Sequence, residues 1–171
     1  MYEKVFLSPL SHASYYPGAT PISLKVLYEK ETLKILGAQG IGYEGVDKRI
    51  DVIATSIYSK LKVYMLKDLD LVYAPPYSSA KDPVNVAGYI ADNIICGLVK
   101  QFYYEDIVSL RKRNDVILLD TRTVNEYSKG HAESFINIPL DDLRNNLNLL
   151  DKNKKIYLVP IYWHTQYTVV K

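Results

Sequence analysis

Two tyrosines in a proline-rich segment are the residues whose type and spacing best suggest chemistry. Residues 73–83 read Tyr-Ala-Pro-Pro-Tyr-Ser-Ser-Ala-Lys-Asp-Pro, so that Tyr73 and Tyr77 stand among three prolines. Proline fixes its own φ angle, removes a backbone donor and pushes the preceding residue towards extended geometry, which predicts a stiff loop here. A phenol held in such a loop can donate a hydrogen bond or a proton without bringing a permanent charge.

The other residue types that could do chemistry lack partners in the sequence. The single cysteine, Cys96, cannot form an internal disulfide, and its apolar neighbours predict a buried, inert thiol. The three histidines, His12, His131 and His164, have no second ligand at helical or loop spacing. No metal site is therefore expected.

Length and composition describe an ordinary globular chain. Its 171 residues, 48% hydrophobic and 23% charged, suffice for one good domain or two small ones. The net charge of +2 arises from Lys and Arg spread along the chain, so neither nucleic acid nor a membrane surface is predicted as a partner. The sequence has no apolar run of membrane-spanning length and no signal-peptide pattern at its start, which predicts a cytoplasmic protein.

Strands are expected first along the chain. They are predicted from about Val5 to Ala13, over Ile22–Tyr28 and over Thr32–Ile41, because these stretches alternate or are rich in strand-forming residues. The polar residues 29–31 predict a hairpin turn between the latter two.

Two helices should follow and cover this sheet. Apolar residues at spacings of three and four predict the buried face of the first helix: Val46, Ile50, Ile53, Ala54, Ile57 and Leu61. The charged residues expected largely on its other faces are Asp47, Lys48, Arg49 and Asp51. The second helix should begin with Asp82 as N-cap and Pro83 as first helical residue. Its predicted buried stripe is Val84, Ala87, Ile90, Ala91, Ile94 and Leu98. Strands followed by helices over one antiparallel sheet make an α+β domain.

After Lys100 the pattern restarts, which predicts domains at residues 1–100 and 101–171. A polar helical stretch near residues 105–112 precedes an apolar strand over Val116–Leu119, and a further strand is predicted over Ile156–Val159. This order suggests the start of a parallel α/β unit.

The first hundred residues resemble the C-terminal dimerisation domain of the FAD-dependent pyridine nucleotide-disulfide oxidoreductases, in the coenzyme A-disulfide reductase and NADH oxidase branch. Five stretches carry the resemblance in order: His12–Gly18, Gly37–Gln39, Glu44–Val52, residues 73–83 and Asp82–Tyr89. In this family the reactive cysteine and the FAD and NAD(P)H sites precede the dimerisation domain. The sequence here has no partnered cysteine and no G-x-G-x-x-G loop after a predicted strand, so no cofactor is expected in the isolated chain.

The resemblance also implies roles for particular residues. Tyr15 and Tyr73 match two tyrosines that reach across the dimer towards the partner's reactive cysteine and assist thiolate chemistry. Ala74 and Pro75 would then lie near the partner's flavin. The implied partner is a second copy of the chain or a full-length oxidoreductase protomer, and the implied substrate is a disulfide of the coenzyme A type.

Residues 120–144 resemble the first half of a rhodanese domain, which some oxidoreductases of this branch carry as a C-terminal fusion. A rhodanese requires a cysteine directly after the strand predicted at Ile156–Val159, because its thiolate accepts the sulfur. This sequence has Pro160 there, and the pattern of the fold stops at Lys171. We therefore expect an incomplete, degenerate rhodanese-like segment without sulfur transfer.

Three readings remain open from the sequence. The chain is a piece of a flavin-dependent disulfide reductase or NADH oxidase, from a shortened reading frame or an excision, and is not catalytic alone. Alternatively, it is a non-catalytic homodimerising module or a product without function. In a third reading, residues from about Asn153 onward are translated out of frame and form a poorly ordered tail. The sequence does not choose among coenzyme A disulfide, a persulfide and oxygen as the parent substrate.

Overall fold

The chain folds into two compact units. The computed structural model describes residues 1–159 and 167–170. The first unit comprises Met1–Cys96 and the second Gly97–Lys171. Each unit is described by itself below.

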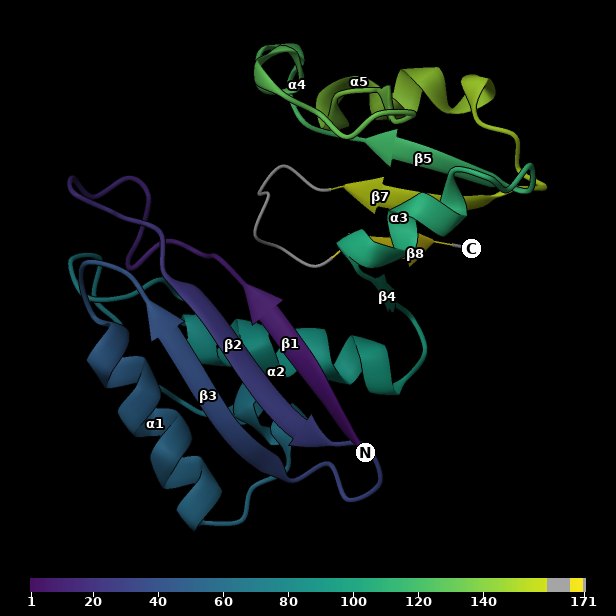
Figure 1. Ribbon diagram of the computed structural model, residues 1–171. Coiled ribbons are helices and arrows are strands. Elements are labelled where there is room, and N and C mark those ends of the chain that lie inside the picture. The colour runs from purple at the N-terminus through teal and green to yellow at the C-terminus, as the bar shows by residue number, and fades with distance from the viewer. Residues whose placement is uncertain (160–166, 171) are drawn as a thin grey trace. The chain divides into compact units, whose positions relative to one another are not determined.

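The first unit is a three-stranded antiparallel sheet with helices packed on one face (Figure 1). Its elements in chain order are β1 (Tyr2–Leu7), β2 (Ser23–Glu29), β3 (Ile35–Ile41), α1 (Val46–Tyr58), the 3-10 helix η1 (Val63–Asp68) and α2 (Pro83–Ile95). The strands follow the order β1-β2-β3, and the predicted hairpin joins β2 to β3. The predicted α+β architecture is confirmed. The first strand is shorter than expected, because residues 8–21 leave the sheet as a loop.

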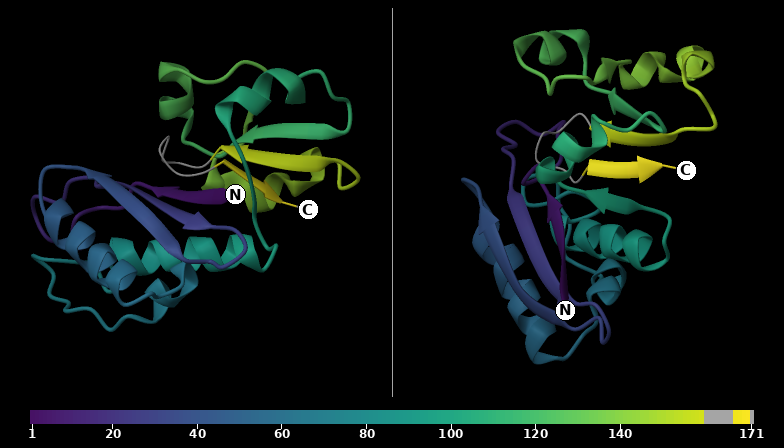
Figure 2. Two further views of the ribbon diagram at one scale, coloured as in Figure 1. Left: turned by 60° about the horizontal axis from the view of Figure 1, so that its bottom comes forward. Right: turned by 45° about the vertical axis from the view of Figure 1, so that its right-hand side comes forward.

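Apolar side chains alternate along the strands and form the buried face of the sheet. On β2, Leu24, Val26 and Tyr28 are buried and alternate with half-buried neighbours, as a strand with one covered face requires. Ile53 from α1 and Val84 from α2 belong to the same buried cluster. The core therefore lies between one face of the sheet and the helices, a layering that both views in Figure 2 show.

Helix α1 buries part of the predicted face, because Ile53 is buried and Val46 and Ile50 pack against the core. Its buried residues are Arg49, Ile53 and Ser56, whereas Ala54 and Ile57 are exposed. The prediction placed Arg49 among the solvated charges, and this was wrong. The spacing of apolar residues cannot show that a cation will pair with a carboxylate in the interior. Arg49 forms such a pair with the buried side chain of Asp82.

Helix α2 begins as predicted, and its first turns pack closely against η1. The Asp82 side chain accepts a hydrogen bond from Val84 N at 3.0 Å, and Pro83 is the first helical residue. Asn85 closes a capping box and donates from Nδ2 to the carbonyl oxygens of Leu66 and Leu69 at 3.0 and 2.9 Å. These bonds fix η1 against the first turns of α2.

The end of α2 departs from the prediction. The helix stops at Ile95, so Leu98 lies beyond it and is 74% exposed instead of buried. Cys96 is also exposed, which corrects the expectation of a buried thiol. The run of apolar residues around Cys96 continues past the end of the helix. Residues beyond that end no longer lie on the buried face of α2.

The second unit is built on a five-stranded sheet in the order β4-β8-β7-β5-β6. Its elements are β4 (Lys100–Phe102), α3 (Tyr104–Leu110), β5 (Val116–Asp120), α4 (Val124–Lys129), β6 (Ile136–Asn137), α5 (Leu140–Leu143), the 3-10 helix η2 (Arg144–Leu149), β7 (Lys155–Val159) and β8 (Tyr167–Val170). Strands β5, β6 and β7 are parallel, as predicted, whereas β8 runs antiparallel to both of its neighbours. Residues 160–166 are too few for the crossover that a parallel connection needs.

A buried ion pair shapes the carboxyl end of β5. Asp120 and Arg122 are each 1% exposed, and Arg122 Nε and Nη2 donate to the Asp120 carboxylate at 3.0 and 2.6 Å. Asn137 Nδ2 donates to the carbonyl oxygens of both residues. These contacts fix the turn that follows β5, at the edge where strand β7 also ends.

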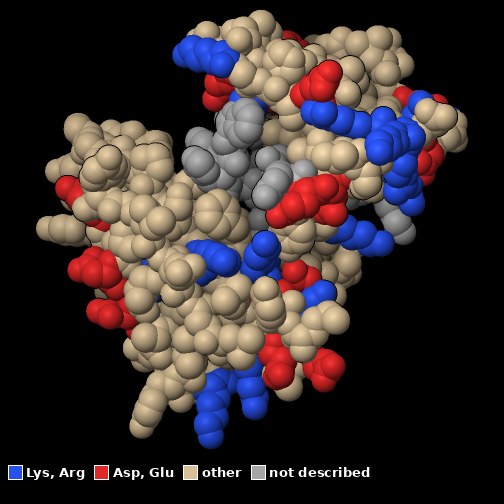
Figure 3. Space-filling model, viewed as in Figure 1, with Lys and Arg blue, Asp and Glu red and all other residues tan. Residues whose placement is uncertain are grey.

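Among the helices of the part that the structure describes, none is long and apolar enough to cross a membrane. On the face seen in Figure 3, basic and acidic side chains both occur on each unit, and much of the first unit carries neither.

Gly88 provides a test of the close packing between α2 and η1. A Cβ atom at this position would lie 2.8 Å from the carbonyl carbon of Leu66, which is backbone that cannot turn aside. We expect Gly88→Ala to lower the free energy of unfolding of the first unit by about 1–3 kcal/mol, a typical cost of overpacking. Gly37→Ala is the matched control, because nothing lies within 4 Å of its Cβ position. Urea unfolding followed by circular dichroism checks this, and equal losses in the two variants would contradict it.

Tyr28 predicts a pH dependence of stability. Burial, with a smaller contribution from the Glu3 carboxylate, raises the pKa of the Tyr28 phenol from 10.0 to about 12. Between these values the unfolded chain releases the proton while the folded chain keeps it, so stability is lost as the pH rises. We expect the urea midpoint to fall over this range, and to fall less in Tyr28→Phe. Identical pH profiles for the two proteins would contradict the prediction.

Candidate functional site

Tyr15 and Tyr73, the two tyrosines selected from the sequence, form a direct pair on the surface of the first unit. Their hydroxyl oxygens are 2.6 Å apart, a hydrogen-bond distance in which either can donate. Both side chains are exposed, Tyr15 by 73% and Tyr73 by 45%. The structure thus brings together two phenols that are 58 residues apart in the sequence and leaves them accessible.

In either direction of this hydrogen bond, the pair retains one free O–H group. When one phenol donates to the other, the acceptor keeps its own O–H, which can donate to a third group. The hydrogen bond with Tyr15 raises the pKa of the Tyr73 phenol above its ordinary value, and desolvation adds to the effect. Tyr73 is therefore protonated and uncharged at neutral pH. The pair presents a neutral hydrogen-bond donor to whatever binds there.

Tyr15 stands in the loop between β1 and β2. Backbone bonds close the base of this loop, with Ser11 N donating to Thr20 O at 2.8 Å and Tyr16 N donating to Ala13 O at 3.0 Å. His12 is buried, its Nδ1 lies 3.2 Å from Ala13 O, and its ring meets Tyr16 edge-on. His12 thus contacts the backbone and a ring of the segment that carries Tyr15.

Tyr73 stands in the proline-rich loop between η1 and α2, which is irregular as predicted. Directly after it, Ala74 O accepts hydrogen bonds from Tyr77 N at 2.9 Å and from Ser78 N at 3.1 Å. This turn contains both Pro75 and Pro76, and Ala74 and Pro75 are half-buried within it. Tyr77, in contrast, is 70% exposed and does not join the phenol pair.

A backbone bond and a guanidinium connect the two loops. Ala13 N donates to Ser78 O at 3.1 Å. Beneath them, Arg49 is 1% exposed, and its Nη2 donates to Ser11 O in the first loop and to Tyr77 O in the second. Sequence reasoning missed Arg49. The spacing of Arg49, Ile53 and Ser56 as one helical face does not distinguish a buried arginine from a solvated one, so no local signal identifies it.

A cavity of about 170 Å³ lies beside this network. It is lined by Ser11, His12, Glu44, Gly45, Lys48, Arg49, Pro76 and Tyr77. The lining joins the two loops to the start of α1, but includes neither Tyr15 nor Tyr73. The phenols therefore project from the surface rather than into this hollow, and a group that meets them must approach from outside the first unit.

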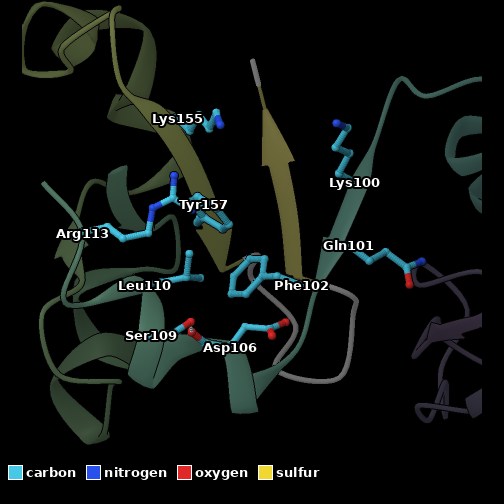
Figure 4. A pocket seen from close by; sticks show the side chains of 9 residues that line it. All are labelled: Lys100, Gln101, Phe102, Asp106, Ser109, Leu110, Arg113, Lys155 and Tyr157. Carbon is cyan, nitrogen blue, oxygen red and sulfur yellow. Dashed lines mark hydrogen bonds between the residues drawn. The ribbon is translucent and has the colours of Figure 1, made fainter. Parts of the chain in front are cut away.

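The second unit has a larger cavity, of about 380 Å³ (Figure 4). Its lining comes from β4, α3, β7 and the segment after α3: Lys100, Gln101, Phe102, Asp106, Ser109, Leu110, Arg113, Lys155 and Tyr157. The Arg113 guanidinium lowers the pKa of the Asp115 carboxyl to about 2, so that this cation is already paired. In the described part of the chain, Asp120 and Arg122 at the carboxyl end of β5 do not line this cavity.

The carboxyl edge of the second sheet is where the sequence resemblance placed rhodanese chemistry. Thr121 Oγ1 donates to Val159 O at 3.1 Å, which joins the ends of β5 and β7. Pro160, at the position of the expected cysteine, lies outside the described residues. His131 stacks on Tyr127 at 3.7 Å between ring centroids. In the described part of the chain, no group of three or more His, Cys, Asp or Glu could hold a metal ion.

Comparisons with known proteins address the two units separately. The family model for the pyridine nucleotide-disulphide oxidoreductase dimerisation domain matches residues 1–83. The model for the rhodanese-like domain matches residues 104–164. This second match extends past Pro160, the position at which the sequence resemblance predicts a cysteine.

Individual relatives agree with both matches. Coenzyme A disulfide reductase of Staphylococcus aureus (strain bovine RF122 / ET3-1) is 44% identical over 90 residues, which are 53% of this chain and 20% of that protein. The crystal structure of reduced Bacillus anthracis CoADR-RHD matches with a TM-score of 0.87 and 48% identity, over 94% of this chain and 28% of that chain. An NAD-dependent persulfide reductase from A. fulgidus matches with a TM-score of 0.81 and 36% identity, with the same coverage.

This chain spans about a fifth of the length of the curated relatives that it matches, and just over a quarter of those two solved chains. Residues 1–83 are a dimerisation domain of the pyridine nucleotide-disulphide oxidoreductase family, and a rhodanese-like domain follows them.

Proposed function

We propose that this chain supplies the dimer interface and a pair of cross-subunit phenols to an FAD-dependent NAD(P)H:disulfide oxidoreductase of the coenzyme A-disulfide reductase type. The observation that carries the proposal is the exposed pair of Tyr15 and Tyr73, whose hydroxyl oxygens are 2.6 Å apart. The names of relatives that are 36–48% identical support the reaction class. The chain is not catalytic alone in this proposal.

The chemistry that the pair can perform suits the cleavage of a disulfide. A thiolate leaving group carries a full negative charge, and a neutral phenol stabilises it by donating a hydrogen bond or by transferring its proton. Because Tyr73 stays protonated at neutral pH, the pair can donate without first being charged. The role of Tyr15 and Tyr73 is therefore to assist the departure of a coenzyme A-type thiolate at the partner's reactive cysteine.

Ala74 and Pro75 fit a position beside the partner's flavin. They follow Tyr73 directly, are half-buried, and belong to a turn whose Ala74 carbonyl already accepts two backbone bonds. A small methyl group and a proline ring leave room for a flat ring system to approach. The bound flavin would supply electron transfer from NAD(P)H to the disulfide, and this chain would position its phenols against that site.

The surface of the first unit supports pairing with a second subunit. Large apolar or aromatic side chains are exposed on the edge strand β3, at the end of α1 and in the proline-rich loop: Leu36, Ile41, Ile57, Tyr58, Val72 and Tyr77. We infer that these side chains take part in the dimer interface, because pairing would remove their apolar surface from water. A stable dimer interface buries on the order of 800 Å² from each partner.

The oligomeric state tests the interface. We expect the purified chain to elute as a dimer in size-exclusion chromatography with light scattering, at a mass that stays constant on dilution through the micromolar range. A buried apolar interface is the reason, because its dissociation would expose that surface to water. A monomeric mass at every concentration would refute the proposed interface.

Complementation tests the phenols. Adding the chain to a coenzyme A disulfide reductase flavoprotein from which the dimerisation domain has been removed should restore NAD(P)H-dependent disulfide reduction. We expect Tyr15→Phe and Tyr73→Phe to lower the restored kcat by about a hundredfold each, the scale of general acid catalysis.

Tyr43→Phe is the matched control, since Tyr43 is 90% exposed and belongs neither to the pair nor to the side chains assigned to the interface, and it should restore activity fully. If a dimer forms but activity does not return, the alternative is favoured, in which the chain is a non-catalytic homodimerising module. If activity returns equally with all three variants, the phenols have no catalytic role.

A further inference from the structure

The Tyr15–Tyr73 hydrogen bond requires a support that the two phenols do not provide. Both side chains are exposed, and a hydrogen bond between exposed groups contributes little net free energy, because water competes for both partners. Tyrosine side chains on two separate surface loops would therefore not hold a 2.6 Å distance by themselves. The backbones that carry them must be fixed relative to each other.

Arg49 contacts both of these backbones. Its Nη2 donates to Ser11 O at 2.8 Å, four residues before Tyr15, and to Tyr77 O at 3.4 Å, four residues after Tyr73. Its Nη1 donates to Gly45 O at 3.0 Å, at the start of its own helix. The guanidinium thus joins α1 to each phenol-bearing loop.

Asp82 also holds the proline-rich loop in place. Its carboxylate lies 2.9 Å from Arg49 Nη2 and accepts from Ser78 Oγ at 2.7 Å, so the end of the proline-rich loop is tied to the N-cap of α2. Arg49 and Asp82 are 1% and 3% exposed. Each buried charge depends on the other, because either one alone would be left desolvated and unpaired.

We propose that Arg49 is a positioning residue for the phenol pair: through Asp82, Ser78, Ser11 and Tyr77 it fixes the two loops so that Tyr15 and Tyr73 meet. The functional meaning of this arrangement rests on the proposed function, whereas the arrangement itself does not. Only a planar guanidinium with several donors in fixed directions can serve these acceptors at once, and the single ammonium of a lysine cannot.

The ionisation of Tyr73 reports whether the pair is formed. The hydrogen bond with Tyr15 is the main cause of the raised pKa of Tyr73, so separation of the loops would bring this pKa down towards the ordinary value of tyrosine. The titration can be followed in the full chain by NMR with ¹³Cζ-labelled tyrosine, and Tyr73→Phe assigns the signal. Global loss of structure is monitored separately by circular dichroism.

We expect Arg49→Lys, which keeps the charge opposite Asp82, to fold and to show a lower pKa for Tyr73 than the parent chain. Arg113→Lys is the matched control, because Arg113 forms an exposed pair with Asp115 in the second unit, and it should leave Tyr73 unchanged. A folded Arg49→Lys protein in which Tyr73 titrates as in the parent would overturn the proposal.

Ser78→Ala provides a milder variant that decides the question if Arg49→Lys does not fold. It removes one link to Asp82 and keeps the buried ion pair. A lowered pKa for Tyr73 in Ser78→Ala supports the proposal, and an unchanged pKa overturns it. These titrations need no turnover, so a failed complementation with a normal Tyr73 titration would refute the proposed function and leave the positioning role intact.

Discussion

Two opposite charges, those of Arg49 and Asp82, lie 2.9 Å apart with almost no exposure to solvent, and the first unit is organised around them. Removing two ions from water is costly, and the cost is offset only if both are fully hydrogen-bonded. Here Arg49 meets backbone oxygens from two loops, while Asp82 also caps α2. Removing one partner of such a pair costs about 3–5 kcal/mol, because the other remains buried and unpaired.

The Arg49–Asp82 ion pair determines where the two surface loops lie, which packing of the core does not do. The sheet and helices would form a core from their apolar faces alone, but a core does not specify where surface loops point. The buried charges do, because hydrogen bonds are directional and their acceptors are backbone atoms of the loops. As a result, two phenols on the outside of the unit are held at 2.6 Å by contacts made on the inside.

The second unit also contains a buried ion pair, but its two residues are much closer in the sequence. Asp120 and Arg122 are two residues apart, so their ion pair shapes a single turn at the end of β5. Arg49 and Asp82 are 33 residues apart and join separate elements of the first unit. The rhodanese-like family model matches residues 104–164, and the sequence has no cysteine within that range.

Local patterns were enough to predict much of the fold. The β2–β3 hairpin follows from the polar turn between two alternating stretches, and the start of α2 follows from the Asp82-Pro83 pair. Errors arose where a residue's environment depends on distant parts of the chain. The burial of Val84, Ala87 and Ala91 on α2 was predicted correctly, whereas the burial of Gly88 reflects the close approach of η1, which no local period reveals. The exposure of Cys96 follows from where α2 ends.

The sequence by itself determined which residues could act and what family they resemble, because phenols, prolines and their spacing are properties of the chain. It selected Tyr15 and Tyr73 and predicted the stiff loop around the second. Only the tertiary structure decided that the two hydroxyls touch, and that a buried Arg49 lies beneath their loops. The physical reason is that an arginine on an amphipathic helix is solvated unless a carboxylate and several carbonyls converge on it, and that convergence exists only in the folded chain.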